Sequence, residues 1–452
     1  MSALPLLIVV LAAGKGTRMK SALPKVMHKI AGRSMLGHVL ALAGSAGAAS
    51  IAVVVGQGME TVADEAVKQA PSARIFIQAE QRGTAHAVLA ARDAIAAHSG
   101  DVLVLYADTP LIRGETIAAL RAGLDAGAGV AVLGFRAFDP TGYGRLLTSD
   151  DDALLAIREE KDANDDERLV DLCNSGVMAF RVPRLDALLS RIDADNAKGE
   201  FYLTDAIELA RADGVRSAVV ECEEDEVLGV NARDQLALAE AIWQDRARIA
   251  FMQAGVTMTA PETVWLSHDT KIGRDVSIEP NVVIGPGVTI GDNVEILAHC
   301  HFERATIGDG ARVGPFARLR PGAALGDGVH VGNFVEIKNT AMAAGSKANH
   351  LAYLGDGVVG AKANIGAGSI FCNYDGFNKH KTEVGEGVFV GSNSSLVAPV
   401  KIGAGAYIGS GSVITKDVAP GALALSRTGQ EERPGWAEKF RIMMSRRKAK
   451  SG

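Results

Sequence analysis

Clustered cysteines, an excess of positive charge and a long apolar run are all missing from this sequence. Its 452 residues include four cysteines, Cys173, Cys222, Cys300 and Cys372, which are widely spread and form no CxxC pair. This usage argues against a disulfide framework and fits a protein of the reducing cytoplasm. The formal net charge of -6 argues against nucleic acid as the main partner.

The apolar start of the chain, Leu4 to Ala13, is too short to span a membrane, which takes about 20 residues. It also lacks the basic residues and the cleavage site of a secretory signal. We therefore interpret it as a buried first strand and expect no membrane partner. The total length exceeds one ordinary hydrophobic core, so we expect two domains.

The C-terminal half carries an apolar residue at nearly every sixth position from Ile272 to Ile414, often followed by glycine. Neither a helix, with a period of 3.6, nor a strand, with a period of 2, produces this ladder, but a hexapeptide repeat does. Each ladder residue then points into a triangular prism of short parallel strands, and glycine relieves crowding where the chain turns a corner. The pattern predicts a left-handed parallel β-helix.

Two breaks in the ladder predict insertions. The ladder skips from Ile337 to Val359, which we interpret as a longer insertion, and from Phe371 to Val384, which we interpret as a shorter one. If three ladder residues make one coil, both insertions leave the prism at the same edge.

Two cations, Arg320 and Lys338, are expected at that edge, one above the other in successive coils. Coils stack at the strand spacing of about 4.8 Å. Like charges that close cost stability unless an anion lies between them. One interpretation is structural pairing with Glu303 or Glu336. The other is a phosphate-binding edge, with the chemistry in the insertions.

Residues 1 to about 230 alternate apolar runs with helical stretches, which is typical of an α/β fold with a mostly parallel sheet. The expected strands are Leu6–Leu11, Ile51–Val55, Arg74–Ile77, Val102–Leu105 and Val130–Phe135. The expected helices include Met35–Leu42, Ala85–Ala97 and Glu115–Leu124. Ligands of such sheets bind beyond the carboxyl ends of the strands, so the loops there are the candidate site.

The loop after the first strand, Leu11–Met19, is rich in alanine and glycine. It fits neither the Walker pattern, because no GK[ST] closes it, nor the dinucleotide pattern, because Met19 replaces the third glycine. Backbone amides without bulky side chains can approach a phosphate, and Lys15, Arg18 and Lys25 offset its charge. The loop predicts phosphate binding; the alternative is a tight turn with solvated charges.

Asp108 directly follows the apolar strand that begins at Val102. An aspartate at such a strand end suits Mg²⁺ held against a phosphate, because this hard cation prefers oxygen ligands. Alone, the same residue also suits the capping of a turn. Together with the first loop, it predicts a site for a nucleoside triphosphate.

Two segments outside the candidate sites, the stretch before Gly255 and the tail after Gly435, also have recognisable patterns. Leu238, Ile242, Ile249 and Met252 recur at helical spacing before Gly255, which predicts a linking helix packed by one stripe. After Gly435 the tail becomes basic, which suits either proximity to an anionic coenzyme or a solvated end.

Motifs from both halves of the chain carry a family resemblance. They are Leu11–Met19 with Leu23–Lys25, Gln78–Gln81 with Gly83–Thr84, Pro140–Arg145, Gly345–Lys347 with His350–Leu351 and Tyr353, and Asn373–Gly376. With these, nearly the whole chain resembles the bifunctional bacterial N-acetylglucosamine-1-phosphate uridylyltransferase and glucosamine-1-phosphate N-acetyltransferase. The resemblance implies a Rossmann-like, GT-A-like uridylyltransferase domain over 1–231, a linker helix over 232–255, and a left-handed β-helix acetyltransferase domain with a basic tail over 256–452.

Two reactions are implied by this resemblance. Acetyl-CoA would acetylate glucosamine-1-phosphate at the C-terminal site, and UTP would then react with N-acetylglucosamine-1-phosphate at the N-terminal site, releasing pyrophosphate. Mg²⁺ would be the cofactor, with acetyl-CoA and UTP as co-substrates. The flat faces of the prism are expected to pack as a homotrimer whose neighbouring subunits complete the second site. A cytoplasmic location follows.

For the first site, the resemblance implies residues around the nucleotide and the sugar. They are Leu11, Ala12, Ala13, Gly14, Lys25, Gln78, Gly83, Thr84, Tyr106, Ala107, Asp108, Gly144, Glu159, Asn174 and Asn231. Asp108 and Asn231 would hold Mg²⁺. The sequence departs from the family at Ala107, where relatives commonly carry glycine.

For the second site, the amine must lose its proton before it attacks a thioester, and a histidine suits that task. The resemblance makes His350, in the predicted longer insertion, the general base. Arg320, Lys338, Tyr353 and Asn364 would bind the sugar phosphate. The implied acetyl-CoA contacts are Ala367, Asn373, Tyr374, Ser392, Ser410 and Arg427, although many relatives carry alanine at the position of Ser410.

Two alternatives stay open at this point. One is a nucleotidyltransferase whose β-helix is a non-catalytic assembly or regulatory module, although such a scaffold has no use for a histidine-bearing insertion on a cationic edge. The other keeps both activities but changes the sugar or the base.

Overall fold

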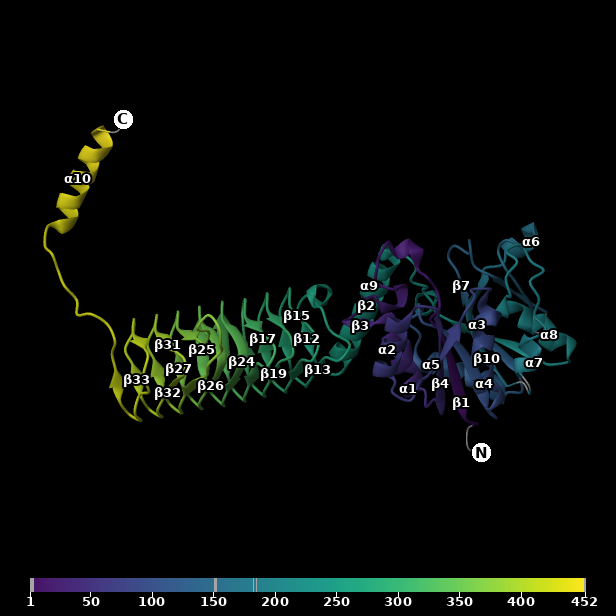
Figure 1. Cartoon of the computed structure of the whole chain (residues 1–452), viewed down its shortest axis with the longest axis horizontal. Helices are drawn as coiled ribbons and strands as arrows, with labels where there is room; N and C mark the ends of the chain where they lie inside the picture. Colours follow the sequence, from purple (N-terminus) through teal and green to yellow (C-terminus); the bar gives the residue numbers. More distant parts are fainter. Residues whose placement is uncertain (1–3, 150–152, 182, 184, 451–452) are drawn as a thin grey trace. The chain divides into compact units, whose positions relative to one another are not determined.

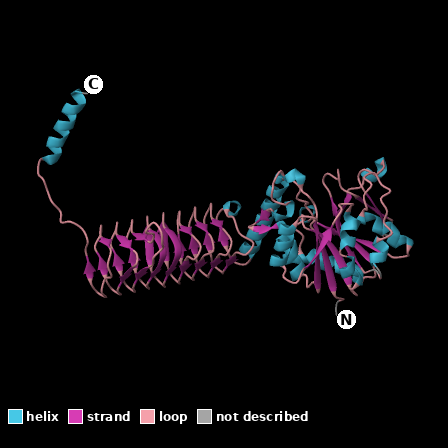
Figure 2. Ribbon diagram, viewed as in Figure 1, coloured by secondary structure: helices cyan, strands magenta, loops and turns pink. Residues whose placement is uncertain are grey.

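The structure is a computed structural model that describes residues 4–149, 153–181, 183 and 185–450. The chain divides into two compact units, one of Met1–Ile249 with Leu266–His268 and the other of Ala250–Trp265 with Asp269–Gly452. The first unit is a layered α/β fold and the second is a prism of short strands followed by a helix (Figures 1 and 2). Within the described ranges, no helix is long and apolar enough to cross a membrane.

The first unit is built on a mostly parallel sheet in the order β11-β7-β10-β6-β1-β4-β5. β1 pairs in parallel with β4 and β6, whereas β10 runs antiparallel to β6 and β7. The hairpin of β8 and β9 joins this sheet through β10. The strands are β1 (Leu6–Leu11), β4 (Ser50–Gly56), β5 (Arg74–Gln78), β6 (Asp101–Tyr106), β7 (Val130–Arg136), β8 (Arg145–Thr148), β9 (Leu154–Arg158), β10 (Leu172–Phe180) and β11 (Ser217–Cys222). A separate ribbon pairs β2 (Lys29–Ile30) with β3 (Arg33–Ser34).

Helices cover both faces of this sheet because successive residues of a buried strand point to opposite sides. Ile8 packs on one side with α1, α2 and α5, and Val9 on the other with α3, α4, α7 and α8. The helices are α1 (Met35–Ser45), α2 (Glu60–Gln69), α3 (Thr84–Ala90), α4 (Arg92–Ala96), α5 (Gly114–Asp125), α6 (Asp165–Arg168), α7 (Leu185–Leu189), α8 (Ala206–Ala212) and α9 (Arg233–Gln253). Short 3₁₀ turns are η1 (Thr17–Met19), η2 (Lys25–Met27), η3 (Leu203–Asp205) and η4 (Glu224–Glu226).

All five expected strands of this unit are confirmed, with ends that differ by at most one residue. The helix expected over Ala85–Ala97 is two helices, α3 and α4, which meet at Ala91. Strands β8 to β11 were not anticipated. β10 carries Asn174, Ser175 and Gly176 in its middle, which interrupts the apolar alternation, and its register with β7 shifts there.

The second unit is a parallel β-helix with three faces. The first face stacks β12 (Thr257–Met258), β14 (Ser277–Ile278), β17 (Glu295–Ile296), β20 (Arg312–Val313), β23 (His330–Asn333), β25 (Lys347–His350), β27 (Asn364–Ile365), β30 (Phe389–Val390), β33 (Tyr407–Ile408) and β35 (Leu423–Ala424). Ladder residues of successive coils pair directly, as Ile278 does with Ile296 and Ile296 with Val313. Their side chains are buried and form the inner core of the prism.

The other two faces share the long strands β24 (Glu336–Met342) and β26 (Tyr353–Val359), which continue from one face to the next. The second face holds β13 (Lys271–Ile272), β16 (Thr289–Ile290), β19 (Thr306–Ile307), β22 (Ala324–Leu325), β29 (Thr382–Val384) and β32 (Val400–Ile402). The third holds β15 (Val283–Ile284), β18 (His301–Phe302), β21 (Arg318–Leu319), β28 (Ile370–Cys372), β31 (Ser395–Val397) and β34 (Val413–Ile414). The turn η5 (Pro261–Thr263) lies between β12 and β13, and α10 (Trp436–Lys450) follows the last strand.

The prediction of a longer insertion after Ile337 is wrong. Ile337 pairs with Leu354, and Met342 pairs with Val359, so this segment is one more coil of the prism. Its ladder residues Met342, Ala348 and Leu354 are at most 2 % exposed. The period is hidden here because alanine is a weak apolar signal. In addition, the steps from Ile337 to Met342 and from Leu354 to Val359 are one residue shorter than six. His350 therefore lies on a regular strand.

The predicted shorter insertion is present. Phe371 pairs with Leu396 and Val359 with Val384, while the chain between β28 and β29 forms a loop closed by a bridge of Tyr374 with Lys379. Asp375 organises this loop, because its carboxylate accepts from the backbone N–H groups of two residues that follow and from His380 Nε2 at 2.7 Å. These hydrogen bonds lower the pKa of Asp375 to about 2.

Leu354→Ala tests the correction. Truncation of this buried side chain should cost about 2–5 kcal/mol of the free energy of unfolding of the β-helix, because it leaves a cavity. Leu351→Ala is the matched control, since Leu351 is 60 % exposed and its truncation opens no cavity. Urea unfolding at a fixed protein concentration, followed by circular dichroism, measures both. If the two substitutions lowered the free energy of unfolding equally, the segment would instead be an insertion outside the core.

Candidate active sites

A cavity of about 320 Å³ lies beyond the carboxyl ends of β1 and β6 in the first unit. Ten residues that the resemblance implied line it, namely Leu11, Ala12, Ala13, Gly14, Lys25, Gln78, Gly83, Thr84, Tyr106 and Asp108. Ala107, between Tyr106 and Asp108, is fully buried and does not line the cavity. The two loops meet there because β1 and β6 are parallel and Leu11 pairs with Tyr106.

Backbone hydrogen bonds fix the loop after β1. The N–H of Ala12 donates to Val54 O at 2.8 Å, and the N–H of Ala107 donates to Leu11 O at 3.0 Å. The side-chain amide of Gln81 donates to Ala13 O. The sequence motif contained Gln81, but no site role was assigned to it. These bonds fix the backbone of the loop where its small residues border the cavity.

Gly83 is required by the packing on the opposite wall. Its φ is 115°, and a Cβ there would lie 2.5 Å from Phe201 O. Thr84 then begins α3, and its hydroxyl accepts from the N–H of Leu203 at 2.9 Å. Gln78 Nε2 lies 3.3 Å from Gly83 O. Gln78, Gly83 and Thr84 thus form one structured wall.

Lys25 joins two residues that are far apart in the sequence. Its ammonium donates to Asp108 Oδ2 and, at 2.9 Å, to Asn231 Oδ1. The Lys25 side chain is 10 % exposed. Two oxygen atoms therefore converge on one point that already holds a positive charge.

These oxygens fit a hard divalent cation. Mg²⁺ is usually held by one or two protein oxygens, with water and substrate phosphates as the remaining ligands. Among the described residues, no group of three or more His, Cys, Asp or Glu side chains is arranged to hold a metal. The donor set thus suits an ion shared with a phosphate rather than one enclosed by protein.

The residues implied for the sugar lie beside this cavity. The N–H of Asn174 donates to Gly144 O at 2.8 Å, and Thr204 Oγ1 donates to Glu159 Oε1 at 3.4 Å. A Cβ at Gly144 would lie 3.6 Å from Glu159 Oε1. Burial raises the pKa of Glu159. Burial and the nearby Asp108 and Glu159 charges raise the pKa of Tyr106, so its hydroxyl stays neutral.

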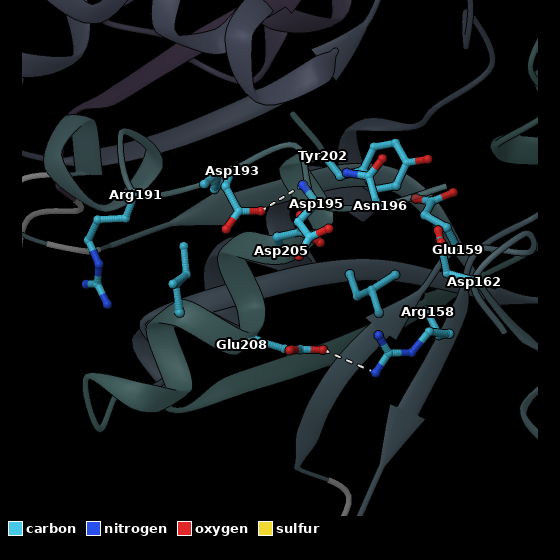
Figure 3. A pocket seen from close by; sticks show the side chains of 13 residues that line it. Arg158, Glu159, Asp162, Arg191, Asp193, Asp195, Asn196, Tyr202, Asp205 and Glu208 are labelled. Atoms are coloured by element: carbon cyan, nitrogen blue, oxygen red, sulfur yellow. Dashed lines mark hydrogen bonds and ion pairs between the residues drawn. The ribbon is translucent and has the colours of Figure 1, made fainter. Parts of the chain in front are cut away.

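Glu159 also lines a second, acidic cavity of about 380 Å³. Figure 3 shows carboxylates of Glu159, Asp162, Asp193, Asp195, Asp205 and Glu208 around it, with Glu208 ion-paired to Arg158. Burial, followed by the like charges of Glu208, Asp193 and Glu159, raises the pKa of Asp205 to about 6.

In the β-helix, each cation of the predicted edge has an acidic partner. Leu319 pairs with Ile337, so Arg320 and Lys338 do lie one coil apart. Arg320 Nη1 is 2.7 Å from Glu336 Oε1, and Lys338 Nζ is 3.4 Å from Asp356 Oδ2. The pairing with Glu336 is one of the interpretations made from the sequence.

Asp356 holds a polar cluster around Lys338. Its carboxylate accepts from Lys338 and from the side-chain amides of Asn339 and Asn373. Although burial opposes the effect, these bonds lower the pKa of Asp356. A Cβ at Gly355 would lie 2.5 Å from Tyr353 Oη and 2.8 Å from Asn373 Nδ2. Tyr353 and Asn373 thus meet over Gly355, beside the Lys338 ion pair. Asp356 itself was not foreseen, because its coil was taken for an insertion.

His350 lies on the first face, at the end of β25. Its Nδ1 is 2.8 Å from Asn333 Oδ1, and it borders a cavity of about 360 Å³. In the described part of the chain, His350 forms no hydrogen bond or ion pair with Arg320 or Lys338. Asn364 begins β27 on the same face, one coil after Lys347.

Four of the residues implied for acetyl-CoA, Ala367, Ser392, Ser410 and Arg427, follow one corner of the prism. The N–H of Asn393 donates to Ala367 O at 2.7 Å, and the N–H of Gly411 donates to Ser392 O at 2.8 Å. At the next coil, Arg427 Nη1 donates to Ser410 O at 2.7 Å. Ala367, Ser392 and Ser410 therefore stack. Tyr374 lies in the loop between β28 and β29 and is 60 % exposed.

Two family models match these two units. Residues 8–169 match the MobA-like NTP transferase domain. Residues 269–304, 304–339 and 381–416 match the six-repeat bacterial transferase hexapeptide. A chain that joins these two parts and carries both sets of candidate residues points to a transferase with two sites.

Curated relatives extend the match to nearly the full length. The "Bifunctional protein GlmU" of Azorhizobium caulinodans is 61 % identical over 98 % of both chains. Those of Xanthobacter autotrophicus and of a Bradyrhizobium strain are 57 % and 58 % identical, covering 99 % and 98 % of this chain and 100 % and 98 % of theirs. The chain belongs to the bifunctional GlmU family. Among solved structures, a UDP-glucose pyrophosphorylase complexed with UDP-glucose covers 54 % of this chain and 99 % of its own, at 18 % identity and a TM-score of 0.44.

Asp205→Asn tests the acidic cavity of this GlmU family member. The folded pKa of Asp205 is raised from its ordinary value of 3.8 to about 6, so the native state loses stability as the pH rises through this window. The substitution should therefore raise the melting temperature of the first unit at pH 7–8 and have little effect near pH 4. Asp93→Asn, at an exposed aspartate of the same unit, is the control. A shift that does not depend on pH would contradict the assignment.

Proposed function

We propose that the two units divide two consecutive reactions, with uridylyl transfer over 1–231, a linker helix over 232–255 and acetyl transfer over 256–452. The chain is a bifunctional enzyme of UDP-N-acetylglucosamine biosynthesis. It first acetylates glucosamine-1-phosphate and then couples the product to UTP. The convergence of Asp108 and Asn231 on the Lys25 ammonium, beside a loop of small residues, is the observation that carries the first site.

In the first site, the phosphate oxygen of N-acetylglucosamine-1-phosphate attacks the α-phosphorus of UTP. A new P–O bond forms as the bond to pyrophosphate breaks. The nucleophile is already anionic, so the step needs no general base. The protein contributes by in-line positioning and by offsetting charge at the α-phosphate. The loop amides after Leu11 and the ammonium of Lys25 supply that charge.

Residues around the cavity divide the substrate between them. Gln78, Gly83 and Thr84 form the wall that reads the uracil. Gly144, Glu159, Asn174 and Tyr106 surround the sugar. The raised pKa of Tyr106 keeps its hydroxyl as a donor.

Mg²⁺ is the divalent ion that we assign to Asp108 and Asn231. When bound, it neutralises phosphate charge on the nucleotide. The Lys25 ammonium contacts the same two oxygens, so a positive charge is compatible with that point.

In the second site, His350 removes a proton from the ammonium of glucosamine-1-phosphate. The free amine attacks the thioester carbon of acetyl-CoA, forming a C–N bond, and the C–S bond breaks to release the thiol. Arg320, Lys338, Tyr353 and Asn364 bind the sugar phosphate. The corner of Ala367, Ser392 and Ser410 receives acetyl-CoA, together with Asn373, Tyr374 and Arg427.

The assembly that we propose is a cytoplasmic homotrimer. His350 and the Arg320–Lys338 cluster belong to different faces of one prism. Packing of flat faces from neighbouring copies supplies a way to bring such groups together. The matched hexapeptide repeats support this arrangement.

Asp108→Asn should lower uridylyl transfer about 100- to 1,000-fold, because the anionic ligand proposed for Mg²⁺, the ion that offsets the phosphate charge, is lost. Thiol release from acetyl-CoA should not change. Pyrophosphate release from UTP and N-acetylglucosamine-1-phosphate is the assay. Asp93→Asn makes the same change of charge at an exposed position of α4 and should leave both rates intact. Parallel loss of both activities would point to misfolding instead.

His350→Ala should have the converse effect. Acetyl transfer should fall about 100- to 10,000-fold, the usual contribution of a general base, while pyrophosphate release stays constant. The control is His301→Ala, at an exposed histidine on β18 of the same prism. Thiol release that survives in the His350 variant would remove the proposed base.

A further inference from the structure

Two strands on the first face of the β-helix are longer than the rest. β23 and β25 each have four residues, whereas the other strands of this face have two. The extra residues place Asn333 directly opposite His350 in the parallel pair. The local extension of the sheet therefore ends at the residue that we assign as general base.

Backbone packing leaves this pair little freedom. The N–H of Leu351 donates to Asn333 O at 3.0 Å, which keeps the two segments in register up to the corner. A Cβ at Gly332 would lie 1.9 Å from Asn349 O, so only glycine permits the strands to approach. Phe334 and Leu351 then turn the corner with φ of 57° and 51°. The positions of both side chains are thus set by the fold.

One hydrogen bond joins the two side chains. His350 Nδ1 lies 2.8 Å from Asn333 Oδ1. A carboxamide oxygen only accepts, so Nδ1 must carry the proton. In a neutral imidazole the lone pair then lies on Nε2. His350 is an exposed residue, which leaves Nε2 accessible to a substrate.

We propose that Asn333 is a positioning residue for acetyl transfer, selecting the tautomer and ring orientation in which Nε2 of His350 is the base. This inference rests on the proposed function of His350. Asn333 acts through the imidazole and does not touch the substrate. Without it, the ring exchanges between tautomers and turns about its terminal torsion, and only part of the population can accept the proton of the amine.

The neighbouring charges explain why an amide is suited to this place. The titratable groups that line the same cavity are Arg312 and His330, and Arg312 Nε is 3.2 Å from Glu295 Oε2. Among the described residues, no carboxylate is hydrogen-bonded to the imidazole. A neutral acceptor orients the ring without placing a negative charge beside it. A carboxylate there would favour the imidazolium and reduce the fraction of free base.

The test compares three variants of the full-length protein. Asn333→Ala removes the acceptor, Asn333→Asp keeps an acceptor but adds a charge, and Asn349→Ala removes a neighbouring amide whose side chain makes no hydrogen bond in the described ranges. Thiol release gives kcat and KM for both substrates of acetyl transfer. Pyrophosphate release by the other unit serves as an internal control of folding and concentration.

Asn333→Ala should lower kcat of acetyl transfer about 10- to 100-fold, with each KM constant within about twofold. Asn333→Asp should recover most of this loss at high pH. Its acidic limb in the plot of kcat against pH should move to higher pH, because the base must be neutral and the carboxylate favours the imidazolium. Asn349→Ala should match the native protein.

Two results would overturn the inference. One is an unchanged kcat in Asn333→Ala while His350→Ala is inactive, which would leave His350 as base without this partner. The other is an Asn333→Asp profile with the native pH dependence, which would show that residue 333 has no contact with the titrating group. Activity retained in His350→Ala would instead overturn the proposed function itself, so the two failures are distinguishable.

Discussion

Parallel strand pairing places residues of equal register side by side, and both candidate sites depend on it. In the first unit, the pairing of Leu11 with Tyr106 brings the loop after β1 and Asp108 to one edge of the sheet. In the β-helix, the same kind of pairing joins residues one coil apart, such as Asn333 and His350. Parallel ladders have evenly spaced hydrogen bonds, so a group at one strand end is held at a fixed height against its neighbour.

The sequence was sufficient for the parts of the fold that carry a strong period. The ladder from Ile272 to Ile337 specified the prism, and β1, β4, β5, β6 and β7 were apparent as apolar runs between helices. The coil of Met342, Ala348 and Leu354 was misread as an insertion because its steps are uneven and alanine carries little signal. The repeat is regular only over whole coils, in which Val331 pairs with Ala348 and Ala348 with Ile365.

Contacts over long sequence distances could not be predicted in the same way. For Arg320 and Lys338 the sequence allowed either a carboxylate partner or a bound anion. It named Glu336, which pairs with Arg320, but not Asp356, which pairs with Lys338. Residues 25 and 231 are separated by 206 positions, and only the folded chain shows that Lys25 bridges Asp108 and Asn231. The motifs nevertheless identified most residues of the candidate first site. Ten of the residues that they implied line one cavity.

The repeated cross-section of the β-helix also has a consequence for how this half of the molecule can change in length. Every coil buries the same kind of ladder residue. Adding or removing a whole coil therefore leaves a continuous core, and the strands on either side of the change can still pair with each other. Packing alone therefore sets no length for the prism. What cannot be exchanged are the coils from Arg312 to Arg427, because they carry the residues that we assign to the second site. Variation in length is thus expected to accumulate before Arg312, away from the segment that holds His350.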